Sequence, residues 1–308
     1  TRRSSDLKNI KEKRRLMQKQ SAMLLVLLGG SCMSFVGLCM RLIEAAEGFQ
    51  ILMYRSMSLC AMVALVCCLR RRVGFFHFLR GLDRHDILMG AALSIAFATY
   101  VFSMLFTSVA STLFIITIAP FMAAIIGWVW IGEKPHPVTW FAMIGAIGGV
   151  SLMIGDGIEM GHTLGNLLAL LSALCFAVML VLARRSGKQD VLGGTFLGGF
   201  FALLIGFVAS LLTGAGIDVS PHDLGIMLFM GAFTIGIGIA FVTWGASYVP
   251  AAEVSLLVLI ESVLGPIWPW LFLGETLSVM EIIGGATVML AVIMMTMFTR
   301  KSIPVTSP

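Results

Sequence analysis

The chain has 308 residues, of which 58% are hydrophobic and 12% are charged, and its formal net charge is +5. A soluble domain carries about twice that charged fraction, and the charge-free stretch between Asp86 and Glu133 is long enough for two membrane helices of roughly 20 residues each. The composition therefore excludes a soluble domain. It also argues against nucleic-acid binding, because the positive excess lies in residues 1–20, as is typical of an arm that faces anionic lipid.

Hydropathy and helix-breaking residues predict an all-α, polytopic membrane protein with ten transmembrane helices. The first five spans are expected near residues 21–43, 48–70, 86–107, 109–131 and 138–155. The second five are expected near residues 164–184, 191–213, 223–246, 250–273 and 278–298. The third and fourth spans run together around Ser108. The connections between spans are short, which leaves no room for a catalytic domain outside the membrane.

The charged loop residues predict the orientation of these spans. If the N-terminus is cytoplasmic, strict alternation places every lysine and arginine except Arg41 and Arg55 on the cytoplasmic side, as the positive-inside rule requires. The outer loops carry acidic residues instead: Glu44, Glu47, Asp156, Glu159, Asp218 and Glu275. The expected location is the bacterial cytoplasmic (inner) membrane, crossed many times, with both termini in the cytoplasm.

The two halves of the sequence are similar to each other. Residues 111–133 and 253–275 are both long apolar segments with a proline near the middle and a Gly-Glu pair at the end, and each precedes a glycine-rich helix. Because five is an odd number, the second copy must enter the membrane in the opposite sense, which is a recurring plan of secondary transporters. We expect a basic arm over residues 1–20, repeats over 21–158 and 159–300, and a cytoplasmic tail over 301–308.

The five-plus-five arrangement, with Ile-Gly-Glu-Lys at 131–134 and Leu-Gly-Glu-Thr at 273–276, resembles the EamA type of the drug/metabolite transporter (DMT) superfamily. The likeness covers nearly all of residues 21–300. It implies a helical bundle around a central cavity that is lined mainly by the first, third, fourth, sixth, eighth and ninth spans. Members of this family export amino acids, metabolites or toxic compounds, and some take up solutes.

Two charged residues lie within predicted spans. Glu261 is near the centre of the ninth span, where an ionised side chain costs roughly 3 kcal/mol unless it is paired or hydrated. It could face the cavity and bind a substrate amine or exchange a proton; alternatively, it is a protonated acid that hydrogen-bonds another helix. Arg55, roughly 10 Å below the outer end of the second span, could contact a substrate carboxylate or pair with Glu261 or Glu47. Its side chain could also reach the outer surface.

Three prolines are predicted to interrupt helices. Pro120 and Pro266 each remove a backbone donor in mid-helix and free the carbonyls of Ile116 and Ser262, and Pro269 adds a second break to the ninth span. Freed carbonyls at membrane depth are tolerated where they face protein or water. These prolines therefore mark a flexible gate or a polar patch in the site, or else simple packing kinks.

Further candidates for the cavity wall are Tyr100, Trp244, Phe35 and Phe176, and Thr117 could supply a hydroxyl. Each has an ordinary packing alternative, such as a hydroxyl bonded back to its own helix.

The predicted function is secondary transport of a small metabolite, such as an amino acid or an amphipathic compound, by alternating access. Export is expected, and an uptake permease of the same fold is an alternative. Protons could be the coupling ion, and the protein is expected to be a monomer or a weak dimer. No cofactor or metal site is expected, and no enzyme motif occurs.

A membrane enzyme acting on lipid would depend on Asp83, His85 and Asp86. A channel or structural subunit is the remaining alternative, although no ring of pore charges is found.

Overall fold

The computed structural model describes residues 2–72, 74–107, 109–154, 163–188, 191–274 and 279–299, and these segments are helical and contain no strand. Within them, nine segments are long and apolar enough to cross a membrane: Gln18–Leu42, Gly48–Leu69, Arg84–Phe106, Phe114–Ile131, Thr163–Arg185, Leu192–Thr213, Pro221–Ala246, Ala251–Leu273 and Val279–Phe298. The apolar helix Pro137–Leu152 is shorter and lies where the fifth span is expected. The all-α, polytopic fold is therefore confirmed. Ser108, the expected meeting point of two spans, lies outside the described residues.

The helices of the first half are α1 (Arg2–Met33), α2 (Val36–Leu42), α3 (Gly48–Arg71), α4 (Phe75–Arg80), α5 (Arg84–Phe106), α6 (Val109–Ile116), α7 (Ala119–Ile131) and α8 (Pro137–Ile154). Those of the second half are α9 (Thr163–Arg185), α10 (Leu192–Thr213), α11 (Pro221–Phe229), the π-helical segment η2 (Met230–Ile237), α12 (Gly238–Ala246), α13 (Ala251–Val258), α14 (Ile260–Leu264), α15 (Ile267–Leu273) and α16 (Val279–Thr299). The first, fourth, eighth and ninth spans are thus each built from more than one helical piece.

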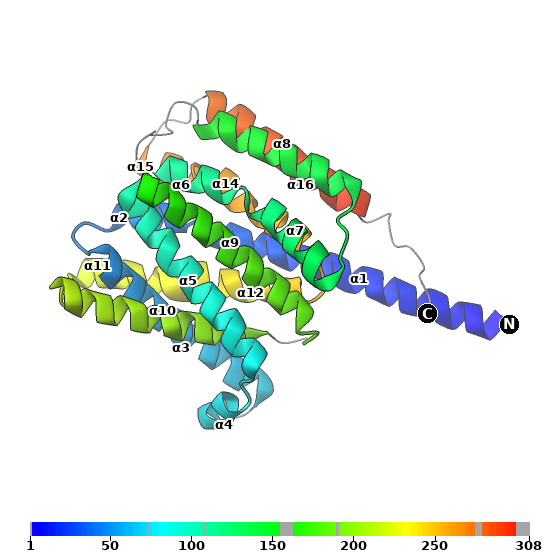
Figure 1. Cartoon of the computed structure of the whole chain (residues 1–308), viewed down its shortest axis with the longest axis horizontal. Coiled ribbons are helices and arrows are strands. Elements are labelled where there is room, and N and C mark those ends of the chain that lie inside the picture. Colours follow the sequence, from blue (N-terminus) through cyan, green and yellow to red (C-terminus); the bar gives the residue numbers. More distant parts are fainter. Residues whose placement is uncertain are drawn as a thin grey trace.

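Each major contact between helices of the two halves has an equivalent contact in which the corresponding helices of the halves change places. α5 packs along α9, and α1 packs along α12, which pairs the third span with the sixth and the first with the eighth. α3 packs on α10, α7 on α13 and α8 on α16, so each of these helices meets its own counterpart. Figure 1 shows α8 and α16 side by side along one edge of the bundle, with α3 and α10 on the opposite side. This exchange is expected of two halves related by a two-fold axis.

The two Gly-Glu corners have a structural cause. α7 ends at Gly132 with φ 72°, and α15 ends at Gly274 with φ 69°. A residue in this left-handed conformation ends a helix, and glycine adopts it without a steric penalty. The repeated glycine in the sequence therefore marks the same helix end in both halves. Glu275, which follows Gly274, lies outside the described residues.

Large apolar side chains cover the outside of the bundle. Val129, Phe141 and Leu212 are 80%, 69% and 82% exposed. Such exposure would be costly in water, but it suits a surface that faces hydrocarbon. The buried interior contains small residues such as Ala123, Ala146 and Ala177, which allow helices to approach one another closely.

The two ends of the bundle differ in charge. We call the end with Lys19, Arg184 and Lys188 the basic end, and the end with Glu44, Glu47 and Asp218 the acidic end. α1 enters the bundle at the basic end and projects beyond it, as Figure 1 shows. The arm that precedes the first span is therefore a continuation of α1.

At the acidic end, one carboxylate ties the two halves together. Asp223 is fully buried at the start of α11, where the Ser220 hydroxyl accepts a hydrogen bond from its backbone N–H at 3.0 Å. Its carboxylate accepts hydrogen bonds from the backbone N–H groups of Glu44, Ala45 and Ala46 at 3.1, 3.0 and 3.0 Å. The loop between α2 and α3 is thus fixed by a residue from the other half of the chain.

Candidate functional site

A cavity of about 90 Å³ lies between the interrupted spans. Its walls combine apolar side chains with one arginine, one glutamate and one tyrosine. The lining residues are Met33, Val36, Arg55, Ala96, Phe97, Tyr100, Ile116, Ser172, Ala173, Phe176, Ile235, Val258 and Glu261. We call this space the central cavity. The structure therefore brings together four of the predicted site residues, which are Arg55, Tyr100, Phe176 and Glu261.

Arg55 is held at depth within the bundle. It is only 3% exposed, its Nη2 donates to the Phe97 carbonyl at 3.2 Å, and its guanidinium lies 5.4 Å from the centre of the Phe97 ring. Gly231 at the start of η2 packs against the Arg55 backbone so closely that a Cβ at this position would collide with the Arg55 carbonyl. The expectation that Arg55 could reach the outer surface is therefore not met.

Arg55 also does not pair with the acids suggested from the sequence. The Glu47 side chain instead caps α3, in a reciprocal pair with Gln50. Among the described residues, no ion pair joins Arg55 to Glu261. An arginine that is buried without a carboxylate partner is costly, so its place in a cavity wall is informative.

Glu261 follows directly on an interruption of the ninth span. α13 ends at Val258, and Leu259 forms a tight turn in which its N–H donates to the Leu256 carbonyl at 3.2 Å. Glu261 then lies in the first turn of α14 and borders the central cavity. Tyr100 is close enough to interact electrostatically with both Glu261 and Arg55. The cavity wall therefore contains a guanidinium and a carboxyl group that are not joined to each other.

Phe35 lies beside the central cavity rather than in its wall. Its ring stacks on Trp268 at 4.0 Å between centroids and meets Phe233 edge-on at 6.3 Å. Trp268 Nε1 also donates to Ser34 Oγ at 2.7 Å. These contacts join the turn between α1 and α2 to α15, on the side of the cavity nearer the acidic end. Phe35 therefore belongs to an aromatic contact between the first and ninth spans.

Two other predicted residues lie away from the central cavity. Trp244 is on α12, where its ring meets Tyr248 edge-on at 5.9 Å. Thr117 is buried, and its hydroxyl donates to the Phe114 carbonyl at 2.5 Å, one turn back along its own span. Neither side chain lines the cavity, so Thr117 adopts the packing alternative stated above.

The prolines have different roles from one another. Pro120 lies in the first turn of α7, so it leaves the Ile116 carbonyl without its helical donor, and Ile116 borders the cavity. Pro266 caps the start of α15 and separates it from α14. Pro269 lies within the first turn of α15, where a proline removes no helical hydrogen bond. It does not make the second break expected of it; that break is at Leu259, where the sequence has no proline.

Among the lining residues that were not predicted from the sequence, Phe97 and Ser172 could have been found by helical spacing. Phe97 precedes Tyr100 by one helical turn on α5, and Ser172 precedes Phe176 by one turn on α9. Residues three or four apart share a helix face. Ser172 Oγ donates to the Ala96 carbonyl at 2.9 Å and so fixes α9 against α5 beside the cavity.

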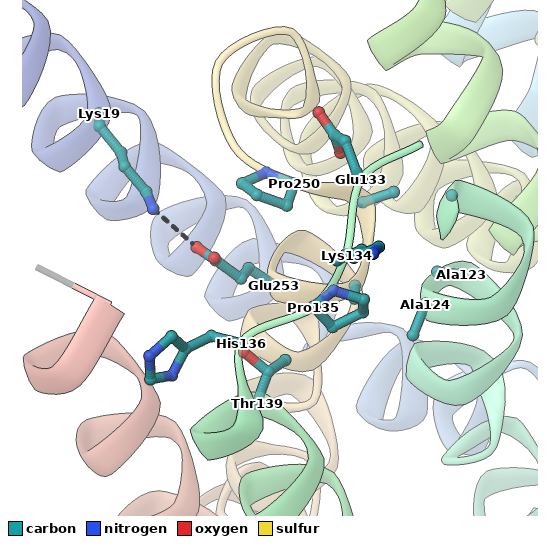
Figure 2. Close-up of a pocket in the computed structure, with 13 residues that line it drawn as sticks. Lys19, Ala123, Ala124, Glu133, Lys134, Pro135, His136, Thr139, Pro250 and Glu253 are labelled. Carbon is teal, nitrogen blue, oxygen red and sulfur yellow. Dashed lines mark ion pairs between the residues drawn. The ribbon is translucent and has the colours of Figure 1, made fainter. Parts of the chain in front are cut away.

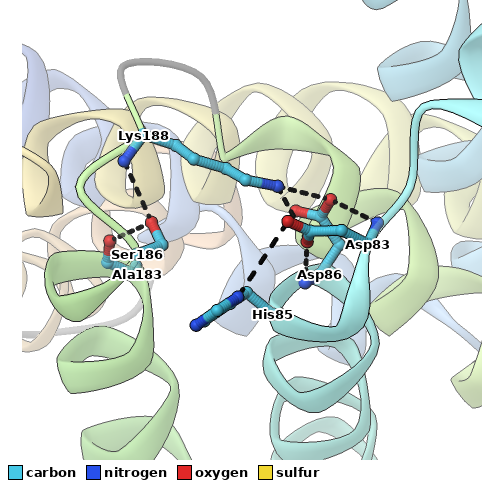
Figure 3. Close-up of polar contacts among 6 residues, drawn as sticks. All are labelled: Asp83, His85, Asp86, Ala183, Ser186 and Lys188. Atoms are coloured by element: carbon cyan, nitrogen blue, oxygen red, sulfur yellow. Dashed lines mark hydrogen bonds and ion pairs between the residues drawn. The ribbon is translucent and has the colours of Figure 1, made fainter.

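The residues that a lipid enzyme would use have another explanation. Figure 3 shows Asp83 and Asp86 at the start of α5 gathered around the ammonium of Lys188, at 2.8 and 2.9 Å. Asp83 accepts a hydrogen bond from the Asp86 backbone N–H, and Asp86 accepts one from that of Asp83, so both are part of the helix cap. The cluster therefore joins α5 to the loop after α9. Among the described residues, no group of three or more His, Cys, Asp and Glu could hold a metal ion.

The ion pairs in this cluster shift the protonation of its members. The hydrogen bond from Lys188 holds the pKa of Asp83 well below its ordinary value, although burial opposes this. Burial alone would lower the pKa of Lys188, but hydrogen bonds to Asp83 and Asp86 raise it above its ordinary value. Asp83 and Lys188 are therefore both charged throughout the neutral pH range.

Comparisons with known proteins agree with this architecture. The model of the EamA-like transporter family matches the chain twice, at residues 20–155 and 163–297. A protein of Archaeoglobus fulgidus described as an uncharacterized transporter is 27% identical over 228 residues, which are 70% of this chain and 78% of that protein. A solved crystal structure shares the fold, with a TM-score of 0.77 and 18% identity over 92% of this chain and 100% of its own. The chain therefore belongs to the EamA-like transporter family and is a multi-pass membrane transporter.

Proposed function

We propose that this transporter carries a small zwitterion, such as an amino acid, through the central cavity by alternating access. One observation carries the proposal: Arg55 and Glu261 border the same cavity but form no ion pair with each other in the described part of the chain. A zwitterion supplies both missing partners. Its carboxylate can form two parallel hydrogen bonds with a guanidinium, and its ammonium can donate to a carboxylate.

The apolar part of the wall supports a substrate with a small side chain. The central cavity is about 90 Å³, whereas open ligand sites are roughly 300 Å³ or more. A cavity of this size fits only a small molecule. Phe97, Tyr100 and Phe176 would then contact the substrate side chain, while the two charged residues hold its polar end.

Binding such a substrate also relieves an electrostatic cost. A single buried charge without a partner is unfavourable, and the cost falls when an opposite charge comes close. A zwitterion neutralises both Arg55 and Glu261 at once, whereas an amine or a carboxylic acid neutralises only one. The cavity should therefore prefer molecules that carry both groups over molecules that carry one.

The charge of the two ends supports an orientation of the transporter in the membrane. We infer that the basic end faces the cytoplasm of a bacterial inner membrane, because basic residues are retained on that side. The basic end also contains a second cavity, of about 290 Å³, which we propose as the entrance for substrate from the cytoplasm. Export is the direction we propose. Glu261 can bind a proton when the ammonium has left, so inward proton movement could drive outward substrate movement.

Counterflow in proteoliposomes tests the proposal. Vesicles containing the purified protein are loaded with unlabelled alanine, and the entry of labelled alanine is followed against equal concentrations of ethylamine, propionate or N-acetylalanine. We expect saturable exchange that is blocked by amino acids and blocked weakly by the three analogues. Equal competition by ethylamine and alanine would contradict a zwitterion site. Flux that rises linearly with concentration would indicate a channel.

A further inference from the structure

The second cavity, at the basic end, is lined by residues from four parts of the fold. It lies between α1, the end of α7 with the turn after it, the start of α8 and the start of α13. Figure 2 shows Lys19, Glu253 and Thr139, which come from α1, α13 and α8, around the same space. At about 290 Å³, this cavity is about three times as large as the central cavity.

Thr139 is the first sign that this cavity receives a ligand. It is 1% exposed and lines the cavity, yet its hydroxyl has no hydrogen-bond partner among the described residues. Thr234 and Thr243, which are also buried, satisfy their hydroxyl groups through the carbonyls of Met230 and Ile239 in the same helical segment. A buried polar group without a partner is unfavourable, so such groups are expected to meet a ligand or another donor.

The charged residues of this cavity match those of the central cavity. Lys19 from α1 and Glu253 from α13 form an ion pair at 3.1 Å, and the Glu253 side chain is only 6% exposed. Glu133, also in the wall, is already engaged by Arg184, whose Nε lies 2.6 Å from its Oε1. Each cavity therefore has a cation and a carboxylate from different helices in its wall, and the basic-end cavity also has Lys134. At the basic end Lys19 and Glu253 are joined, whereas Arg55 and Glu261 are apart.

We propose that the basic-end cavity is a second substrate site, where a zwitterion binds before it moves to the central cavity. The substrate ammonium replaces Lys19 on Glu253, and the released Lys19 ammonium binds the substrate carboxylate. The exchange is favourable because two ion pairs form where one is broken. The Thr139 hydroxyl donates to the substrate carboxylate, which gives it the partner that the protein does not provide.

The ninth span connects the two sites. Glu253 in α13 borders the basic-end cavity, and Glu261 in α14 borders the central cavity. At 1.5 Å per residue, these two carboxylates are roughly 12 Å apart along the span. A substrate ammonium could therefore pass from one carboxylate to the other, with the interruption at Leu259 between them. This inference depends on the proposed function for its substrate class.

Thr139→Val tests the second site without removing a charge. Valine has nearly the same shape, and the hydroxyl has no internal partner, so a purely structural role predicts an unchanged or more stable transporter. A binding role predicts that the KM for alanine rises about tenfold when substrate is supplied at the basic end. The KM at the acidic end should stay unchanged. Thr296→Val, which removes a hydroxyl bonded to the Val292 carbonyl in α16, is the matched control and should change neither value.

The stoichiometry of equilibrium binding provides an independent readout. Tritiated alanine should bind the purified full-length protein at two sites per chain, and Glu253→Gln and Glu261→Gln should each leave one. Transport of alanine with one binding site in the wild-type protein would overturn the second site and leave the proposed function intact. Absence of both transport and binding of amino acids would overturn the proposed function and the second site with it. An equal KM change at both ends in Thr139→Val would also contradict the second site.

Discussion

The fourth and ninth spans turn at equivalent positions but differ in what they place there. α6 ends at Ile116 and α13 ends at Val258, and these residues correspond when 111–133 is aligned with 253–275. Both spans then resume and end at a glycine with positive φ. At the position of Glu261 in the ninth span, the fourth span has Ala119. The scaffold is thus repeated, whereas the charge is not.

The two turns also differ in their cause. The turn in the fourth span precedes Pro120, which cannot donate to the Ile116 carbonyl. The corresponding residue in the ninth span is Ser262, yet its N–H donates to the Leu259 carbonyl at 3.0 Å in a tight turn, and the helix is interrupted all the same. A proline therefore accompanies the turn in the fourth span, whereas the ninth span turns without one. We infer that the symmetric turns serve alternating access, while the single carboxylate makes the binding site asymmetric.

The largest effect should come from moving the charge between the two turns. Ala119 is 2% exposed and does not line the central cavity, so Ala119→Glu would bury a carboxylate without a partner. We expect a loss of about 3 kcal/mol or more of stability, seen as a fall in detergent-stable protein by fluorescence-detected size-exclusion chromatography. Glu261→Ala should instead yield normal amounts of folded protein, because the cavity accommodates the change. Normal folding of Ala119→Glu would show that the two turns are interchangeable.

An intermediate effect is expected from the prolines. Pro266→Ala gives the Ser262 carbonyl a donor and can join α14 to α15, so it should slow exchange of alanine several-fold with little change in KM. Pro120→Ala should have a smaller effect, because the equivalent turn in the ninth span forms without a proline. Rates measured in proteoliposomes under saturating substrate would compare the two. A larger effect of Pro120→Ala would show that its ring causes the first turn.

The smallest effect is expected from removing a contact at the start of α5, where an acidic residue is held differently from its counterpart at the start of α11. Asp223 is held by three backbone N–H groups, whereas Asp86 is held by the side chain of Lys188. Because Lys188 and Asp83 are partly exposed to solvent and Asp86 keeps its hydrogen bond from the Asp83 backbone N–H, Lys188→Met should cost about 0.2–1 kcal/mol and leave transport unchanged. Asp223→Ala should be the more destabilising of the two. A thermal-shift series on both variants would rank the two contacts.

The effect of Lys188→Met should also be independent of pH in the neutral range. A depressed pKa at Asp83 means that its stabilising contribution is lost only as the pH falls below about 4, and a raised pKa at Lys188 means that the contribution is lost only above about 10. The melting-temperature difference from wild type should therefore be constant between about pH 5 and 9. A difference that changes between pH 6 and 8 would contradict this account of the cluster.

Much of this organisation is predictable from the sequence because the membrane imposes simple constraints. Charges are excluded from lipid, so Arg55 and Glu261 stand out within apolar spans, and both border the central cavity. Trp244 and Phe35 could not be placed in the same way, since an aromatic ring is equally stable in a cavity wall or in helix packing. The turn at Leu259 has no proline or glycine to mark it. It depends on contacts between the halves, which a linear sequence does not show.

Selectivity of the Arg55→Ala and Glu261→Gln variants tests the central claim most directly. The inhibition constants of alanine, ethylamine and propionate would be measured against alanine exchange for the wild type and both variants. If the two residues hold opposite ends of a zwitterion, Arg55→Ala should weaken alanine and propionate about 10- to 100-fold while sparing ethylamine. Glu261→Gln should weaken alanine and ethylamine while sparing propionate. The same loss of affinity for all three ligands in both variants would contradict the account.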